Sequence, residues 1–165
     1  MAAPPHGLSA IRAAYGEIKI MRDPRGGWRI YEPASWESRN CVALPLPTLR
    51  RTLYVHRLIA GPLLEALERA QRATPDYAIK TIGCFCPRPK RTVSQPSAVI
   101  GWDSGLSIHS VAGAVDVNAL SNPMRRPLQT DMPPAFIDAW RAVGWTWGGD
   151  FPTPDPMHFQ WASGY

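Results

Sequence analysis

Two pairs of acidic and imidazole side chains stand in the C-terminal half of the chain. His109 and Asp116 lie within residues 106–118, which read LSIHSVAGAVDVN, and Asp155 and His158 follow in PDPMHFQW. Imidazole nitrogen and carboxylate oxygen are good zinc ligands, and three protein ligands with a fourth position open to water are typical of a catalytic zinc site. Taken singly, such a histidine is more often a core residue and such an aspartate a turn residue. Together they predict a zinc-dependent hydrolase.

Strand patterns surround both pairs. In GAVDVN the two valines alternate with Asp116, which predicts a strand that turns Asp116 away from its buried face. In MHFQW the apolar residues alternate with His158 in the same way. If the two strands are neighbours, Asp116 and His158 share a cleft, and Gly113 allows a tight turn that brings His109 beside them. Asp155 stands between two prolines that restrict the backbone, which suits a carboxylate held beside a metal rather than on it.

The order of these residues resembles a known family. The motif S-x-H-x(6)-D, followed by W-G-G-D and then D-x-M-H-F, resembles the VanY-type zinc peptidases of bacterial cell walls. That family includes D-alanyl-D-alanine carboxypeptidases and L-alanyl-D-glutamate endopeptidases of phage lysins. The resemblance implies that His109, Asp116 and His158 bind Zn2+, that Asp155 is the catalytic base, and that Ser107 opens the motif.

The resemblance also implies a fold. We expect an α+β domain of the Hedgehog/DD-peptidase type, with a small, mostly antiparallel sheet flanked by helices. The length of 165 residues suits a single domain. We place this zinc peptidase domain at 1–165, with its catalytic core at 76–162 and a less closely matching N-terminal part at 1–50. The family usually has glycine three residues after the first histidine, where this chain has Ala112 followed by glycine.

A substrate-binding arginine is also implied. In the family an arginine upstream of the first zinc histidine faces the substrate; in GCFCPRPKR the closest counterpart is Arg88, with Arg91 second. A guanidinium can hold a carboxylate or a polarised carbonyl through paired hydrogen bonds. The alternative is an arginine in a solvated loop.

Apolar spacing predicts the supporting elements. We expect a helix over residues 54–73, kinked or restarted at Pro62, a short strand over 77–82, and an amphipathic helix over 133–143. We expect Asp150 to accept a hydrogen bond that orients a loop or a ligand histidine.

Composition excludes several classes of protein. The formal net charge of +5 could favour an anionic polymer, but no run of Lys and Arg resembles a nucleic-acid-binding arm, and an ordinary basic surface explains the charge equally well. The three cysteines, Cys41, Cys84 and Cys86, cannot all pair and lack a zinc-knuckle spacing, so we expect them reduced or structural. With no basic leader and no long apolar run, we expect neither a signal peptide nor a membrane span. We also expect a monomer. Such a protein is made in the cytoplasm and acts on the bacterial wall after release or as part of a virion.

These observations predict hydrolysis of a peptide bond in peptidoglycan stem peptides. We favour an L-Ala–D-Glu endopeptidase of phage endolysin type, with a D-Ala–D-Ala carboxypeptidase as the other possibility. Two readings without catalysis remain open. One is a cell-wall-binding or virion structural module that keeps the zinc fold, and the other is a Hedgehog-like zinc interaction domain.

Overall fold

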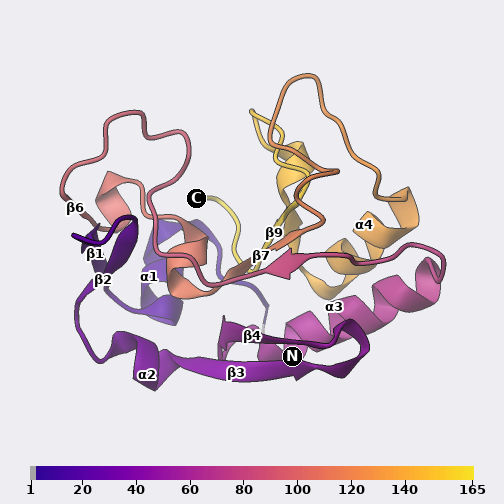
Figure 1. The fold of residues 1–165 in the computed structure, drawn as a ribbon, viewed down its shortest axis with the longest axis horizontal. Helices are drawn as coiled ribbons and strands as arrows, with labels where there is room; N and C mark the ends of the chain where they lie inside the picture. Colours follow the sequence, from indigo (N-terminus) through magenta and orange to yellow (C-terminus); the bar gives the residue numbers. More distant parts are fainter. Residues whose placement is uncertain (1–2) are drawn as a thin grey trace.

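The computed structural model describes residues 3–165 and is an assembly of small antiparallel sheets and helices. Within these residues the strands form three sheets, with orders β2-β1-β6, β3-β4 and β5-β7-β9-β8, and all paired strands in them run antiparallel. Figure 1 shows the four-stranded sheet in the middle, with the N-terminal elements at one end of the long axis and two long helices at the other. The predicted α+β class, with antiparallel sheets flanked by helices, is confirmed.

The N-terminal end is built from a helix and a hairpin. The order is α1 (Gly7–Tyr15), β1 (Lys19–Arg22), β2 (Trp28–Glu32) and α2 (Trp36–Asn40), and β6 (Val99–Ile100) joins the free edge of β1. Helix α1 ends at Gly16, whose φ of 86° is a conformation that glycine adopts without steric cost. The hairpin tip at residues 23–27 is largely exposed.

A second hairpin precedes the longest helix. It consists of β3 (Cys41–Leu46), the 3-10 turn η1 (Pro47–Leu49) and β4 (Arg51–His56), and is followed by α3 (Ala60–Ala73). The predicted helix over 54–73 is therefore wrong at its start, because β4 pairs with β3 residue by residue as far as Cys41 opposite His56. Pro62 does not kink the helix: it lies in the first turn, where a missing N–H and a fixed φ are tolerated.

The central sheet carries the C-terminal half of the chain. Its strands are β5 (Ile82–Gly83), β7 (Ala114–Val117), β8 (Thr146–Trp147) and β9 (His158–Gln160). The predicted strand over 77–82 is reduced to β5, because the Asn118 side chain takes the place of a partner strand before it. Asn118 Oδ1 accepts hydrogen bonds from the amides of Lys80 at 2.7 Å and Thr81 at 3.0 Å, and its Nδ2 donates to Ala78 O at 2.9 Å.

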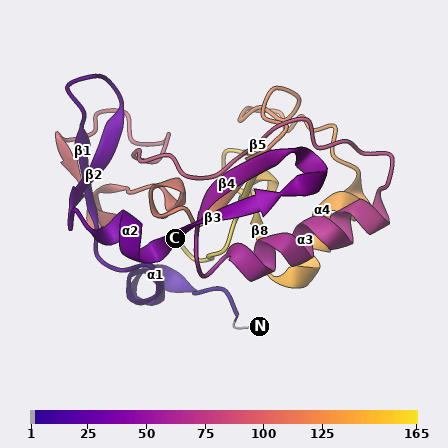
Figure 2. The ribbon, with the colours of Figure 1, turned by 60° about the horizontal axis from the view of Figure 1, so that its bottom comes forward.

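Helix α4 (Pro134–Val143) covers one face of this sheet and packs along α3 (Figures 1 and 2). Its predicted range is confirmed, and the helix ends at Gly144, which has a φ of 119°. The Trp140 ring stacks on Phe159 of β9 with ring centroids 4.4 Å apart. The aromatic stripe of α4 thus fixes β9, one of the two strands that carry the candidate site, from behind. No helix within residues 3–165 is long and apolar enough to cross a membrane.

The two ends of the described chain lie side by side. The amide of Gly7 donates to Ser163 O at 2.8 Å, and the amide of Ser163 donates to Pro5 O at 3.0 Å. These bonds fasten the segment before α1 to the segment after β9.

Candidate metal centre and cleft

Strand pairing brings Asp116 and His158 face to face. Strands β7 and β9 are neighbours with Asp116 directly opposite His158, as the alternating patterns predict. The 3-10 turn η3 (Ile108–Val111) brings His109 to the same place. His109 Nε2 lies 3.0 Å from Asp116 Oδ1 and 3.0 Å from His158 Nδ1, and the latter two atoms are 3.2 Å apart.

The other ring nitrogen of each histidine is occupied. His109 Nδ1 lies 2.7 Å from Cys84 O, which can only accept, so this nitrogen carries the hydrogen. His158 Nε2 lies 3.0 Å from Gln160 Oε1, and the Gln160 amide nitrogen donates to Ala162 O at 3.1 Å. In the neutral rings, the two nitrogens that face Asp116 therefore have free lone pairs.

Three lone pairs that converge without a hydrogen between them fit a metal ion. In a tetrahedral zinc site, bonds of about 2.0–2.1 Å separate the ligand atoms by roughly 3.3 Å, close to the distances between these atoms. His109, Asp116 and His158 form a group within residues 3–165 whose ligand atoms all lie within 4.8 Å of one another. The donor set, two imidazole nitrogens and a carboxylate oxygen, suits zinc.

The electrostatics of the group agree with this arrangement. Burial alone would raise the pKa of the Asp116 carboxyl, but its contacts with His109 and His158 outweigh burial and bring this pKa far below its usual range. Burial lowers the pKa of His109, although Asp116 opposes the change. The site therefore offers a carboxylate and a neutral imidazole at neutral pH, the protonation states that metal binding requires.

The turn between His109 and β7 differs from the prediction in one detail. Its left-handed residue is Ala112, with φ 49° and ψ 32°, and not Gly113. Gly113 is required for space instead, because a Cβ there would lie 2.8 Å from the Tyr15 ring. The amide of Ala112 donates to His109 O at 3.1 Å, which closes the turn.

Asp155 lies in a tight turn beside the three candidate ligands. Its amide donates to Gly148 O at 2.8 Å, and its carbonyl oxygen accepts from the amide of His158 at 3.0 Å. Gly148 is close to this turn, and a Cβ there would lie 2.4 Å from Asp155 O. The carboxyl oxygen Oδ1 is buried and has no hydrogen-bond partner within residues 3–165. Burial raises the pKa of this carboxyl.

A cleft of about 290 Å³ opens over Asp155 and His158. The loop before β6 contributes Arg88, Lys90 and Arg91, which form the cationic wall, and the loops after β7 and before β9 contribute Met124 and Phe151. In Figure 1 the loop before β6 is drawn in pink, and the loops after β7 and before β9 are drawn in orange and yellow. Both arginines predicted to face a substrate therefore line the cleft.

The cationic wall is fixed to the histidine motif by its backbone. The amide of Ser107 donates to Arg88 O at 3.1 Å, and Ser110 Oγ donates to the same oxygen at 2.8 Å while accepting from the Arg88 amide at 2.9 Å. Farther along, the amide of Cys86 donates to His109 O at 3.1 Å. The segment that carries the arginines and the turn that carries His109 thus form one unit.

Two further residues, Asp150 and His56, lie outside the candidate site. Asp150 is exposed and accepts a hydrogen bond from Arg141 at 2.6 Å, so of its two predicted roles it can hold a loop. It does not orient a ligand histidine; Gln160 and Cys84 O do this. His56 packs against the rings of Tyr15 and Trp36, and burial lowers its pKa to about 4. The role of Gln160 in orienting His158 was not predicted, although its spacing from His158 places both on the same face of one strand.

The three cysteines are free thiols, as predicted: Cys41, Cys84 and Cys86.

The His-Asp-His group adjoins a cleft that is lined by His158 and by the unpaired carboxyl of Asp155, and this arrangement suits a metal-dependent hydrolase. Residues 101–161 match a protein-family model described as D-alanyl-D-alanine carboxypeptidase. This segment contains all three candidate ligands and Asp155, and the match confirms the resemblance to the VanY-type family. It supports a peptidase of D-alanyl-D-alanine carboxypeptidase-like kind. Comparison with curated proteins and with solved structures gives no match.

Proposed function

We propose that the protein is a zinc peptidase that hydrolyses peptide bonds in peptidoglycan stem peptides. The observation that carries this proposal is the convergence of one ring nitrogen from each histidine and the Asp116 carboxylate beside a cleft that also contains Asp155. Zinc held by His109, Asp116 and His158 would supply a water nucleophile at neutral pH and polarise the scissile carbonyl.

Asp155 is the proposed general base. Its unpartnered oxygen can accept a proton from the attacking water, and the protonated carboxyl can then donate to the leaving amine. Removing such a group typically lowers the rate about 10²- to 10⁴-fold. Because burial raises its pKa, this carboxyl holds a proton more readily than an exposed aspartate does.

Arg88 and Arg91 are the proposed substrate-binding cations of the cleft. A guanidinium there can orient the peptide or stabilise negative charge that develops on the carbonyl oxygen. We favour the L-Ala–D-Glu bond, because the glutamate carboxylate left free beside that bond would meet the cationic wall. The D-Ala–D-Ala bond is the second candidate, and the family description favours it.

The decisive experiment is mass spectrometry of defined stem peptides after incubation with the zinc-loaded protein, with a chelator-treated control. A chelator-sensitive product with a new D-Glu amino terminus identifies the endopeptidase, and loss of a single D-Ala identifies the carboxypeptidase. Absence of any product, with zinc bound and the fold intact, would favour the non-catalytic wall-binding or virion module. Release by host lysis or carriage on a virion stays a prediction.

Replacing Asp155 by Ala should separate metal binding from catalysis. We expect turnover to fall about 10²- to 10⁴-fold, while zinc content measured by atomic absorption stays at that of the wild type. Asp138→Ala is the matched control, because Asp138 is an exposed residue of α4 that pairs with Arg141 and lies outside the cleft lining. Loss of zinc from the Asp155→Ala protein would contradict its assignment as base.

A further inference from the structure

Lys90 is a cation of the cleft wall that no acidic side chain among residues 3–165 neutralises. It is half-buried, and its Nζ lies 3.2 Å from the centre of the Tyr165 ring. Arg88 and Arg91 also lack an acidic partner within residues 3–165, so what distinguishes Lys90 in this wall is its seat on the Tyr165 ring. Within residues 3–165 no carboxylate lies at ion-pair distance from Lys90, and burial lowers its pKa.

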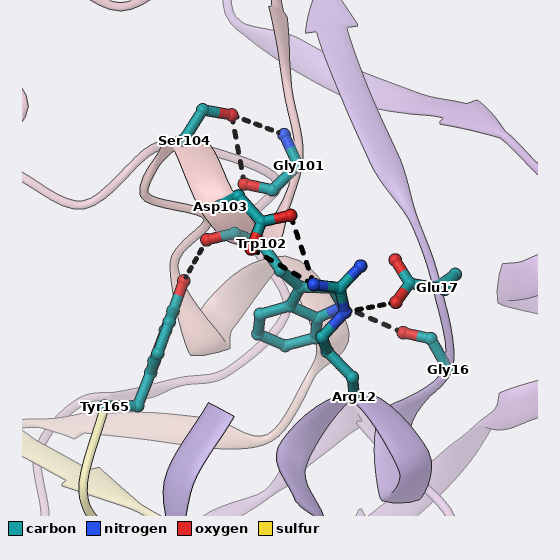
Figure 3. A network of polar contacts seen from close by, with 8 residues as sticks. All are labelled: Arg12, Gly16, Glu17, Gly101, Trp102, Asp103, Ser104 and Tyr165. Atoms are coloured by element: carbon teal, nitrogen blue, oxygen red, sulfur yellow. Dashed lines mark hydrogen bonds and ion pairs between the residues drawn. The ribbon is translucent and has the colours of Figure 1, made fainter. Parts of the chain in front are cut away.

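The ring beneath Lys90 is held in place. The Tyr165 hydroxyl donates to Leu106 O at 2.7 Å and lies 3.2 Å from Trp102 O. The indole of Trp102 stands edge-on to the Tyr165 ring and donates to Gly16 O at 2.9 Å. Figure 3 shows that Asp103, the residue after Trp102, pairs with Arg12 of α1. The N-terminal helix and the 3-10 turn η2 (Trp102–Ser104) thus support the ring.

The backbone of Lys90 is fixed as well. Its amide donates to Gly105 O at 2.8 Å, its carbonyl oxygen accepts from the amide of Val93 at 3.0 Å, and the preceding Pro89 forms a β-bridge with Leu106. An ammonium seated on a π face is attracted to it and keeps its remaining N–H groups for another partner. Lys90 and Tyr165 therefore form a built position at the rim of the cleft, open to an anion.

We propose that Lys90, positioned by Tyr165, binds a free carboxylate of the stem peptide and makes the protein select acidic peptides over amidated ones. This inference rests on the proposed function, since it assigns a ligand group to the same cleft. The carboxylate could come from the glutamate side of the peptide or from its C-terminus. Amidation of the bound group removes its negative charge and replaces an acceptor oxygen by a donor NH2, which Lys90 cannot bind.

The test measures binding apart from turnover. The zinc-loaded full chain carrying Asp155→Asn is titrated by calorimetry with three forms of one stem peptide: the free acid, the form amidated at the glutamate carboxyl, and the form amidated at the C-terminus. We expect one of the two amidations to weaken binding about tenfold, the loss typical of a charged hydrogen bond. Which amidation does so identifies the source of the carboxylate.

Lys90→Met is then added to the Asp155→Asn protein. This change removes the ammonium group and keeps an unbranched apolar side chain on the Tyr165 ring. The free acid should then bind about tenfold more weakly, and the sensitive amidation should have no further effect. Tyr165→Leu should likewise reduce the ratio of the affinity for the free acid to the affinity for the amidated peptide. Lys80→Met is the matched control, because Lys80 is exposed, lies outside the cleft, and has the same charge.

Each result has a defined meaning. An amidation penalty that persists in Lys90→Met, or that is absent before this change, overturns the inference, as does failure of every peptide to bind. Parallel turnover assays on the protein with Asp155 restored test the proposed function separately. Peptides that bind with acid preference but are never cut contradict the peptidase, whereas peptides that are cut without acid preference contradict only the role of Lys90.

Discussion

A single acceptor sets the orientation of each candidate ligand histidine. Cys84 O holds one nitrogen of His109, and Gln160 holds one nitrogen of His158, so that the other nitrogen of each ring faces Asp116. Groups of this kind typically raise ligand basicity and fix the ring. The motif predicted the three side chains that come together, because their types and spacing carry that information. It could not predict the acceptors, since a backbone carbonyl leaves no trace in the sequence.

Gln160 should therefore contribute to metal affinity without touching the metal. We expect Gln160→Leu to weaken zinc binding about 10- to 100-fold, because the Nε2 hydrogen of His158 loses its acceptor. Competition against a chromophoric chelator measures the dissociation constant. Gln160→Glu keeps an acceptor oxygen and should retain most of the affinity. Equal affinity of the Leu variant and the wild type would show that Gln160 does not orient the ring.

At the scale of elements, the pairing of β7 with β9 and the turn before β7 assemble the site. The alternation of apolar residues predicted both strands and the face that each presents, because side chains alternate with a period of two. The same reasoning misassigned residues 54–59, since apolar spacing over a few residues fits a strand as well as a helix. It also predicted too long a strand before β5, because the sequence does not reveal that the Asn118 side chain takes the place of a partner strand there.

Neighbouring positions of the turn should respond to mutation in opposite directions. Ala112→Gly relieves a left-handed alanine, so the free energy of unfolding should rise by about 1 kcal/mol. Gly113→Ala inserts a methyl group against the Tyr15 ring, which cannot withdraw because it is buried and its hydroxyl donates to Trp161 O at 2.8 Å. Overpacking of this kind typically costs about 1–3 kcal/mol.

Urea unfolding of both variants in the metal-free and zinc-loaded states measures these changes. The metal-free state isolates the effect on the backbone from any effect on the ligand geometry. Stabilisation by Gly113→Ala, or destabilisation by Ala112→Gly, would contradict the assigned roles of the two residues.

At the scale of the whole molecule, the N-terminal elements act as supports for the site. Tyr15 packs against the turn after His109, and Arg12 and Gly16 connect to the group that holds Tyr165. No chemistry was predicted for these elements, and none of the candidate ligands comes from them. Their contribution depends on contacts between residues far apart in the chain, such as Tyr15 with Trp161, and a single sequence does not reveal such pairs.

The hydrogen bonds between Pro5, Gly7 and Ser163 have a consequence for how the chain can be reconnected. The segments around Gly7 and Ser163 already lie side by side, so a short linker can join them. The order in which the elements follow one another along the chain should then have little effect on folding. A circular permutant joined by a short Gly/Ser linker and opened in the exposed hairpin tip, between Arg25 and Gly26, should fold and bind zinc with an affinity within about threefold of the parent. Loss of zinc binding in that permutant would mean that the hairpin between β1 and β2 must be continuous for the site to form.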